Sequence, residues 1–292
     1  MSRGFPCLAA AEHLERGDVL VFPLGLVPTP SAEDQDFLRT ELPRALRLKN
    51  ISYHVRGDYL SGLRGSIDVM ERTRAVLRDW QAAVQEALGE FLPAYAAGWR
   101  PGKTNFRPVE ERGRDLPRRS SNEYLHVDAF ASGATHGDRV LRFFANIHPD
   151  STRVWRTAGH LADLVARYGE GRVRVTPTVL DRAWSCVARG LALLVPAAEL
   201  LETSRYDRAM RRLHNRLKDD DTFQADTRGQ TTLEFAPGTS WAVMTDVVSH
   251  AVTSGQHALV TTFHVRLCDC ILPELAPWHV LARADRGGVV SP

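Results

Sequence analysis

The longest regular pattern in the chain is a run of apolar residues at helical spacing between Ile67 and Tyr95. Its apolar positions are Ile67, Met70, Val76, Leu77, Trp80, Val84, Leu88 and Leu92. This period places them on one face of an amphipathic helix, which we expect to be part of the scaffold. Gly89 and Pro93 are expected to end or break the helix. Another helix should begin near Ser31, a good N-cap residue that is followed by acidic residues.

Elsewhere the pattern favours short strands, because β-branched and aromatic residues gather in runs between turn-rich stretches. These runs span residues 19–22, 103–109, 124–128, 139–147, 230–235, 240–245, 247–252 and 258–267. The dipeptides Pro237-Gly238 and Ser254-Gly255 supply turns between the later strands. Short strands at this spacing predict an antiparallel sandwich or barrel.

A stretch that looks helical separates the earlier strands from the later ones. Its clearest helical patterns span residues 161–168 and 206–217. We therefore predict an α+β fold in which residues 1–292 form one domain. Its parts are a helical N-terminal layer over residues 1–100, a β core over 101–150 and 222–270, and a mainly helical insert over 151–221. The polar and basic stretch at 111–120 is expected to be an exposed loop.

The composition is that of a soluble globular protein, with 43% hydrophobic and 25% charged residues. A formal net charge of +2 gives no reason to expect a nucleic-acid partner. Arginine greatly outnumbers lysine, which suits the recognition of carboxylates or phosphates but can equally reflect GC-rich coding. The basic run from Arg205 to Lys218 is expected to be a solvated helix face.

The four cysteines show no disulfide framework and no paired zinc-site spacing. Cys268 and Cys270 could in principle hold a metal, but ordinary thiols in a reducing compartment are the simpler interpretation. The N-terminus has no charged start followed by an apolar segment, so we expect no signal peptide. No apolar run approaches the length of a membrane span. These features together predict a cytoplasmic location.

Two residues in the expected strand at 124–128 offer a metal site. His126 and Asp128 are two positions apart, and strand residues alternate between faces, so both side chains should lie on the same face. An imidazole and a carboxylate are two of the three protein ligands of a non-haem Fe(II) site, which leaves positions open for a co-substrate and dioxygen. His250, in a strand beyond the insert, is the candidate third ligand. Alternatively, Asp128 caps a strand and His250 is an ordinary core histidine.

Iron with three protein ligands needs a bidentate co-substrate, usually 2-oxoglutarate, whose far carboxylate requires a fixed cation. Arg142, Arg107 and Arg266 are the candidates, in that order. The first two lie in expected strands among apolar neighbours, where a buried arginine must be paired and a carboxylate is a natural partner. The alternative is that each arginine pairs with a protein acid, such as Glu110, Glu123 or Asp246.

Most of the candidate residues lie within a set of longer motifs, namely Lys49-Asn-Ile-Ser-Tyr53, Thr104-Asn-Phe-Arg-Pro-Val-Glu110, Leu125-His-Val-Asp-Ala-Phe130 with Thr135-His-Gly137, Leu141-Arg-Phe-Phe-Ala-Asn-Ile147, Arg153-Val-Trp-Arg156 and Val248-Ser-His-Ala-Val-Thr-Ser-Gly-Gln256. In these motifs, and over most of its length, the chain resembles the Fe(II)/2-oxoglutarate-dependent 3-deoxy-D-manno-oct-2-ulosonic acid (Kdo) 3-hydroxylases of Gram-negative bacteria. Together these motifs are far more specific than a His-x-Asp triplet. The loop from 111 to 121 and the tail after Leu272 depart from the family pattern, which leaves substrate length and membrane contact open.

The resemblance implies a double-stranded β-helix (jelly-roll, cupin-like) dioxygenase. Such an enzyme replaces C–H by C–OH at C3 of Kdo in the lipopolysaccharide inner core, converting Kdo to Ko with release of succinate and CO2. It implies that Fe(II) binds His126, Asp128 and His250, and that Arg142 serves 2-oxoglutarate. The candidate contacts with the sugar acid are Arg107, Asn146, Arg153 and Arg156. His136, in a loop close behind the triplet, could also contact substrate or could simply be solvated.

The implied partner is a Kdo-containing glycolipid such as Kdo-lipid A, which makes peripheral contact with the cytoplasmic face of the inner membrane plausible. Two alternatives remain open from the sequence. One is a 2-oxoglutarate oxygenase that acts on a different sugar acid or lipid. The other is a non-catalytic β-barrel that binds a ligand without chemistry. No oligomeric state follows from the sequence.

Overall fold

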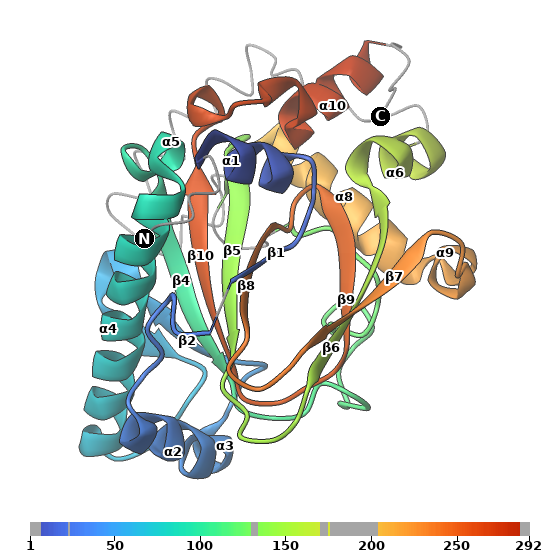
Figure 1. Ribbon diagram of the computed structural model, residues 1–292. Coiled ribbons are helices and arrows are strands. Elements are labelled where there is room, and N and C mark those ends of the chain that lie inside the picture. Colours follow the sequence, from blue (N-terminus) through green and yellow to red (C-terminus); the bar gives the residue numbers. More distant parts are fainter. Residues whose placement is uncertain (1–6, 23, 130–133, 170–174, 176–203, 287–292) are drawn as a thin grey trace.

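Figure 1 shows the computed structural model, which describes residues 7–22, 24–129, 134–169, 175 and 204–286. Its strands are β1 (Leu20–Phe22), β2 (Ile51–His54), β3 (Tyr59–Ser61), β4 (Arg100–Arg107), β5 (Arg139–Asn146), β6 (Arg153–His160), β7 (Gln230–Phe235), β8 (Ser240–Met244), β9 (Val248–Ser254) and β10 (Ala258–Val265). They form a seven-stranded sheet in the order β1-β8-β5-β10-β4-β2-β3 and a three-stranded sheet in the order β7-β6-β9. Neighbouring strands are antiparallel in both sheets.

The helices surround these sheets. They are α1 (Cys7–Glu15), α2 (Ala32–Thr40), α3 (Leu42–Ala45), α4 (Ile67–Phe91), α5 (Pro93–Ala96), α6 (Leu161–Tyr168), α8 (Arg205–Asp219), α9 (Asp221–Ala225) and α10 (Pro277–Asp285). Short 3₁₀ turns lie at Val55–Gly57, Leu267–Asp269 and Pro273–Leu275. In Figure 1, α4 runs along the outside of the seven-stranded sheet, whereas α6, α8 and α9 lie on the side of the three-stranded sheet. No helix among the described residues is long and apolar enough to cross a membrane.

The core lies on both faces of the seven-stranded sheet, as the alternation along β5 illustrates. Phe143 points to the outer face, where its ring centroid lies 6.1 Å from that of Trp80 in α4. Phe144 points the other way and meets Trp155 of β6 with 4.7 Å between ring centroids. Phe235 of β7 stacks on Trp241 of β8 at 3.7 Å. The two sheets therefore pack face to face around an aromatic layer, as in a jelly roll.

Helix α4 forms where the apolar period predicts it. Ser66 is its N-cap and accepts a hydrogen bond from the backbone N–H of Val69. Gly89 lies inside the helix and does not end it, because a single glycine costs only about 1 kcal/mol in a helix that packs against a sheet. Pro93 instead begins α5, where its missing N–H costs no helical hydrogen bond.

Three sequence-based expectations need correction. Residues 124–128 do not form a strand; they contribute a single bridge between His126 and His250. The expected helical insert begins with a strand, β6, and the expected helical N-terminal layer contains the short strands β2 and β3. These segments all carry polar residues. Whether such a segment becomes a strand depends more on its pairing with other strands than on its local propensity. Residues 170–174 and 176–203 of the insert, including Cys186, lie outside the described residues.

Candidate active site

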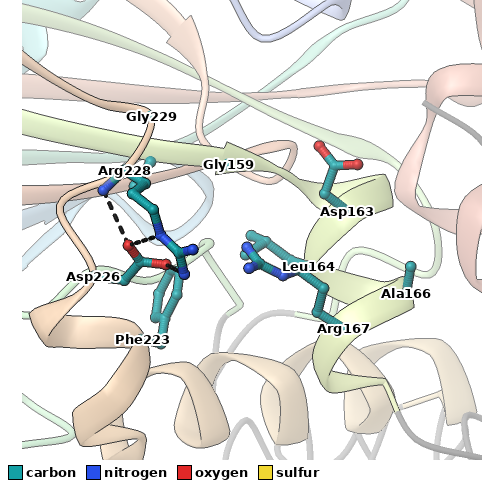
Figure 2. A pocket seen from close by; sticks show the side chains of 10 residues that line it. Gly159, Asp163, Leu164, Ala166, Arg167, Phe223, Asp226, Arg228 and Gly229 are labelled. Atoms are coloured by element: carbon teal, nitrogen blue, oxygen red, sulfur yellow. Dashed lines mark hydrogen bonds and ion pairs between the residues drawn. The ribbon is translucent and has the colours of Figure 1, made fainter.

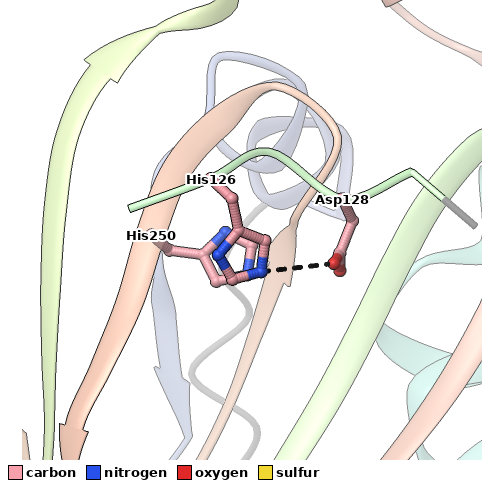
Figure 3. Close-up of side chains that lie close together, drawn as sticks. All are labelled: His126, Asp128 and His250. Atoms are coloured by element: carbon pink, nitrogen blue, oxygen red, sulfur yellow. Dashed lines mark ion pairs between the residues drawn. The ribbon is translucent and has the colours of Figure 1, made fainter. Parts of the chain in front are cut away.

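His126, Asp128 and His250 converge in the interior, as Figure 3 shows. Their possible ligand atoms all lie within 4.8 Å of one another, and all three residues are buried. His250 belongs to β9. The backbones of His126 and His250 exchange two hydrogen bonds, of 3.1 and 2.9 Å, and the N–H of Asp128 donates to the carbonyl of Thr245 at 2.8 Å. Backbone pairing thus brings together residues that are far apart in the sequence.

Both imidazoles are oriented by their own backbone. Nδ1 of His126 lies 2.7 Å from the carbonyl oxygen of Tyr124, and Nδ1 of His250 lies 3.2 Å from that of Val248. A carbonyl oxygen only accepts, so each Nδ1 is the donor and Nε2 keeps its lone pair. This arrangement orients a histidine for metal binding.

The protonation states also suit a divalent cation. Burial lowers the pKa of His126 well below its usual value and that of His250 to about 4. Burial opposes ionisation of Asp128, but Arg142, whose Nε lies 3.1 Å from Oδ2, helps to bring the pKa of that carboxyl down to about 2. At neutral pH the imidazoles are neutral and the carboxylate is charged, which are the forms that bind metal. The three residues therefore fit an Fe(II) site with open positions.

Side chains of α8 and α9 hold the segment that carries His126 and Asp128. Gln224 accepts a hydrogen bond from the N–H of Leu125 and donates one to its carbonyl oxygen, both at 2.9 Å. Nζ of Lys218 donates to Ser121 O at 2.7 Å, and Nδ1 of His214 lies 2.8 Å from Val127 O. The ring centroid of His214 also lies 4.9 Å from that of His126. These contacts replace the strand pairing that the segment lacks on this edge.

A cluster of buried charges lies beside the three residues. Oε1 of Glu111 accepts a hydrogen bond from Nη1 of Arg107 at 3.2 Å and lies 3.5 Å from Nη2 of Arg153. All three side chains are almost fully buried. Arg107 is close enough to His250 for its charge to add to the effect of burial on the pKa of that imidazole. With Arg142 and the carboxylates of Glu111 and Asp128, these five residues comprise three positive and two negative charges, a net charge of +1.

Several buried polar atoms in this region have no hydrogen-bond partner among the described residues. They are Nε of Arg107, Nε of Arg153 and Nε1 of Trp155. The Trp155 ring is stacked on His250, with 5.3 Å between ring centroids and an interplanar angle of 19°. A buried donor without a partner costs about 1–3 kcal/mol, so a ligand that accepts these bonds would be favoured. Together with the excess charge, these donors favour an anionic ligand.

The remaining sequence candidates make contacts with residues other than these three. The Asn146 amide donates to Phe235 O and Ser151 O, both at 2.9 Å, and so closes a turn. Arg156 is opposite Ala251 in the ladder and therefore lies on the other face of β6 from Thr157, the partner of His250. His136 is half-exposed and lies 3.8 Å from Asp207. Arg266 forms an exposed ion pair with Asp269 at 2.7 Å.

Glu111, Trp155, His214 and Gln224 were not anticipated from the sequence. Trp155 could have been found through the motif Arg153-Val-Trp-Arg156, but the sequence predicted a helix there, and only the strand β6 places Trp155 and Arg153 on one face. The acid that pairs with Arg107 is Glu111 and not Glu110 or Glu123, while Asp246 pairs with Arg139. His214 and Gln224 lie in the helical part of the chain, and no local pattern links them to the candidate metal ligands.

A pocket lies between α6 and the turn that precedes β7, lined by other residues. Its volume is about 430 Å³, and Figure 2 shows Arg167 on one side and the Arg228–Asp226 ion pair on the other. None of the sequence-predicted site residues lines it.

The comparisons with known proteins agree with this geometry. The chain matches the family model of 3-deoxy-D-manno-oct-2-ulosonic acid (Kdo) hydroxylase over residues 7–286. It is also similar to solved structures of the Kdo hydroxylase KdoO, a non-heme Fe(II) alphaketoglutarate-dependent dioxygenase. In complex with alphaketoglutarate and Fe(III), KdoO is 31% identical, with 96% of this chain and 90% of that chain covered and a TM-score of 0.79. In complex with cobalt(II), KdoO is 32% identical, with 97% of this chain and 91% of that chain covered and a TM-score of 0.80.

A search of the curated proteins found no match. The structural similarity confirms the predicted α+β fold with a jelly-roll-like core, and the prediction of an Fe(II)/2-oxoglutarate dioxygenase. Because the family model matches nearly the whole of this chain, the chain belongs to the Kdo hydroxylase family.

Proposed function

We propose that this protein hydroxylates C3 of Kdo in the lipopolysaccharide inner core and so converts Kdo to Ko. In the balanced reaction, one oxygen atom of O2 enters the sugar and the other enters succinate, while 2-oxoglutarate loses CO2. The observation that carries the proposal is the buried His126, Asp128 and His250 group beside a cluster of arginines. It combines a metal site with a place for an anionic co-substrate.

His126, Asp128 and His250 would hold Fe(II) through Nε2, a carboxylate oxygen and Nε2. Iron bound there supplies the oxidising power for C–H hydroxylation, together with 2-oxoglutarate and dioxygen. The protein's own contribution is to orient the imidazoles through their Nδ1 hydrogen bonds and to keep the Asp128 carboxylate charged through Arg142. The Trp155 ring packs against His250 and excludes water from that side.

We infer that 2-oxoglutarate is bound by Arg142, Arg107 and Arg153, with Trp155 as a further donor. The net positive charge of the cluster, the donors of Arg107, Arg153 and Trp155 that have no partner among the described residues, and the contact of Arg142 with Asp128 support this set over Arg266, which is paired with Asp269 at the surface. Arginine forks match carboxylates in a bidentate way, and in this water-poor interior such charge-assisted bonds are strong.

The substrate that we propose is a Kdo-containing glycolipid. Because its lipid part stays in the membrane, we expect the protein to act at the cytoplasmic face of the inner membrane through peripheral contact. We also propose that residues 1–292 act as one dioxygenase domain, since α4, β5 and the three-stranded sheet share continuous packing.

Anaerobic titration of the protein with Fe(II) and 2-oxoglutarate tests the co-substrate site, because their joint binding creates a charge-transfer absorption band. Air is then admitted in the presence of Kdo-lipid A. We expect succinate to form and the Kdo unit to gain the mass of one oxygen atom, measured by mass spectrometry.

Succinate without a change in Kdo would point to another acid or lipid substrate. Absence of both the band and succinate would leave a ligand-binding protein without this chemistry.

A further inference from the structure

The inner face of the seven-stranded sheet changes from apolar to polar across its width. One row of residues in register crosses six strands: Trp241, Phe144, Val260, Asn105, Ser52 and Ser61. The first three belong to the apolar cluster that the sheet shares with β6, β7 and β9. The last three, on β4, β2 and β3, are polar. The strands at this edge of the sheet therefore present a different surface from those at its centre.

The adjoining positions on the same strands are also polar. His54 is opposite Lys103 on β4 and Tyr59 on β3. Its ring stacks on that of Tyr59 with 4.1 Å between centroids, and its Nε2 lies 2.8 Å from Oγ of Ser61. These residues and the polar half of the row form what we call the polar wall: Ser52, His54, Tyr59, Ser61, Lys103 and Asn105.

The alternation along β2 shows which face the polar wall occupies. Ile51 and Tyr53 are buried in the core on the outer face, with exposed fractions of 0% and 3%. Ser52 and His54 therefore face inward. Oγ of Ser52 donates to Oδ1 of Asn105 at 2.6 Å, so neighbouring strands hold these groups in fixed positions.

The polar wall lies next to the metal site. On β4, Arg107 follows Asn105 on the same face. On β5, Arg142 contacts Asp128 and is opposite Thr262 of β10, the strand that pairs with β4. A three-stranded sheet can cover only part of a seven-stranded one, and the residues of the polar wall are half-buried or exposed. Half-buried polar groups on an inner face indicate access from solvent.

We propose that the polar wall is the subsite that binds the sugar acid, with its hydroxyl groups bonded by Ser52, His54, Ser61 and Asn105 and its acid group attracted by Lys103. This inference rests on the proposed function and assigns the substrate to residues outside the arginine cluster. Ser52 donates to Asn105 and keeps its lone pairs as acceptors for a sugar hydroxyl, so an acid with many hydroxyl groups can make more hydrogen bonds here than one that lacks them. The polar wall would in this way select a polyhydroxylated acid.

The test measures binding without turnover. Protein loaded with Co(II) and 2-oxoglutarate under anaerobic conditions is titrated with Kdo-lipid A in detergent, as wild type and as the variants Asn105→Ala and His54→Ala. Each variant removes a hydrogen-bonding group, so we expect a dissociation constant about tenfold higher. The affinity for 2-oxoglutarate should not change. Tyr53→Phe, on the opposite face of the same strand, is the matched control and should bind Kdo-lipid A as wild type does.

Unchanged affinity for Kdo-lipid A in both variants would overturn the proposal. Equal losses for Kdo-lipid A and 2-oxoglutarate would show instead that the polar wall only supports the sheet. Aerobic turnover of wild type, measured separately, tests the proposed function. If wild type binds Kdo-lipid A and the variants lose that affinity, but wild type does not hydroxylate it, the proposed reaction fails and the subsite stands; if wild type does not bind it, both fail.

Discussion

At the scale of single residues, buried charge distinguishes this interior from an ordinary sandwich core. Glu111 lies between Arg107 and Arg153, and the pKa of its carboxyl is lowered: burial opposes ionisation, but the arginines outweigh it. A buried charge is tolerated only when it keeps a partner. Glu111 therefore makes it possible to bury two arginines, and the charge left over favours a dianion.

Arg107→Lys tests this interpretation. Lysine keeps the positive charge but loses the planar fork, so we expect the dissociation constant of 2-oxoglutarate to rise about tenfold or more. Cobalt(II) affinity should stay unchanged, because Arg107 is not paired with Asp128. Isothermal titration measures both constants. Arg266→Lys, at the exposed pair with Asp269, is the control. If the control weakens 2-oxoglutarate binding and Arg107→Lys does not, the assignment of the co-substrate cation is wrong.

Lys49 predicts a pH effect on stability. Burial, with a further contribution from Arg107, lowers the pKa of Lys49 from 10.5 to about 7. Between these pH values the unfolded chain holds a proton that the folded protein has released, so this residue makes the free energy of unfolding rise with pH.

Lys49→Met removes that dependence. We expect wild type to gain stability relative to the variant above pH 7, by up to about 1.4 kcal/mol per pH unit. Urea denaturation of the metal-free proteins at several pH values measures this difference. A difference that falls as the pH rises would contradict the assignment.

At the scale of elements, the segment with His126 and Asp128 is held on one side by a strand and on the other by a helical side chain. On one side it pairs with the backbone of β9, where Val252 N donates to Asn122 O at 2.8 Å. On the other side the amide of Gln224 bonds both backbone groups of Leu125, as a neighbouring strand would. A helix pair thus takes the place of a strand. This explains why a segment with strand-like composition carries two proposed metal ligands without forming a regular strand.

Gln224→Leu should therefore weaken metal binding. Groups that orient metal ligands typically contribute about 10–100-fold to metal affinity, and we expect a loss in this range for cobalt(II). Titration followed by the cobalt absorption spectrum measures it, and circular dichroism checks the fold. Thr222→Ala, at an exposed position of the same short helix, should bind cobalt as wild type does. Equal affinities for wild type and Gln224→Leu would show that β9 alone holds the segment.

At the scale of the whole molecule, the proposed metal joins a segment before the insert to a strand after it. A ligand that binds only the folded state adds about 2.7 kcal/mol at a concentration one hundred times its dissociation constant. For a chain of this size that corresponds to a rise in Tm of about 4 °C.

We expect cobalt(II) to produce this rise in a thermal melt and a chelator to reverse it. His250→Ala should abolish the rise, whereas His13→Ala, at an exposed position, should preserve it. A rise of equal size in His250→Ala would place the metal elsewhere.

The sequence by itself determined the features that depend on local periodicity. Helix α4, the strands β5 and β7, and the choice of His126, Asp128 and His250 follow from residue spacing and type, because amphipathic periods and ligand chemistry are written along the chain. Only the tertiary structure decided the rest. Strand β6 forms because β7 and β9 pair with both its edges, and Glu111 rather than Glu110 meets Arg107. Long-range pairing and the burial of charge depend on which segments meet in space, and no local window contains that information.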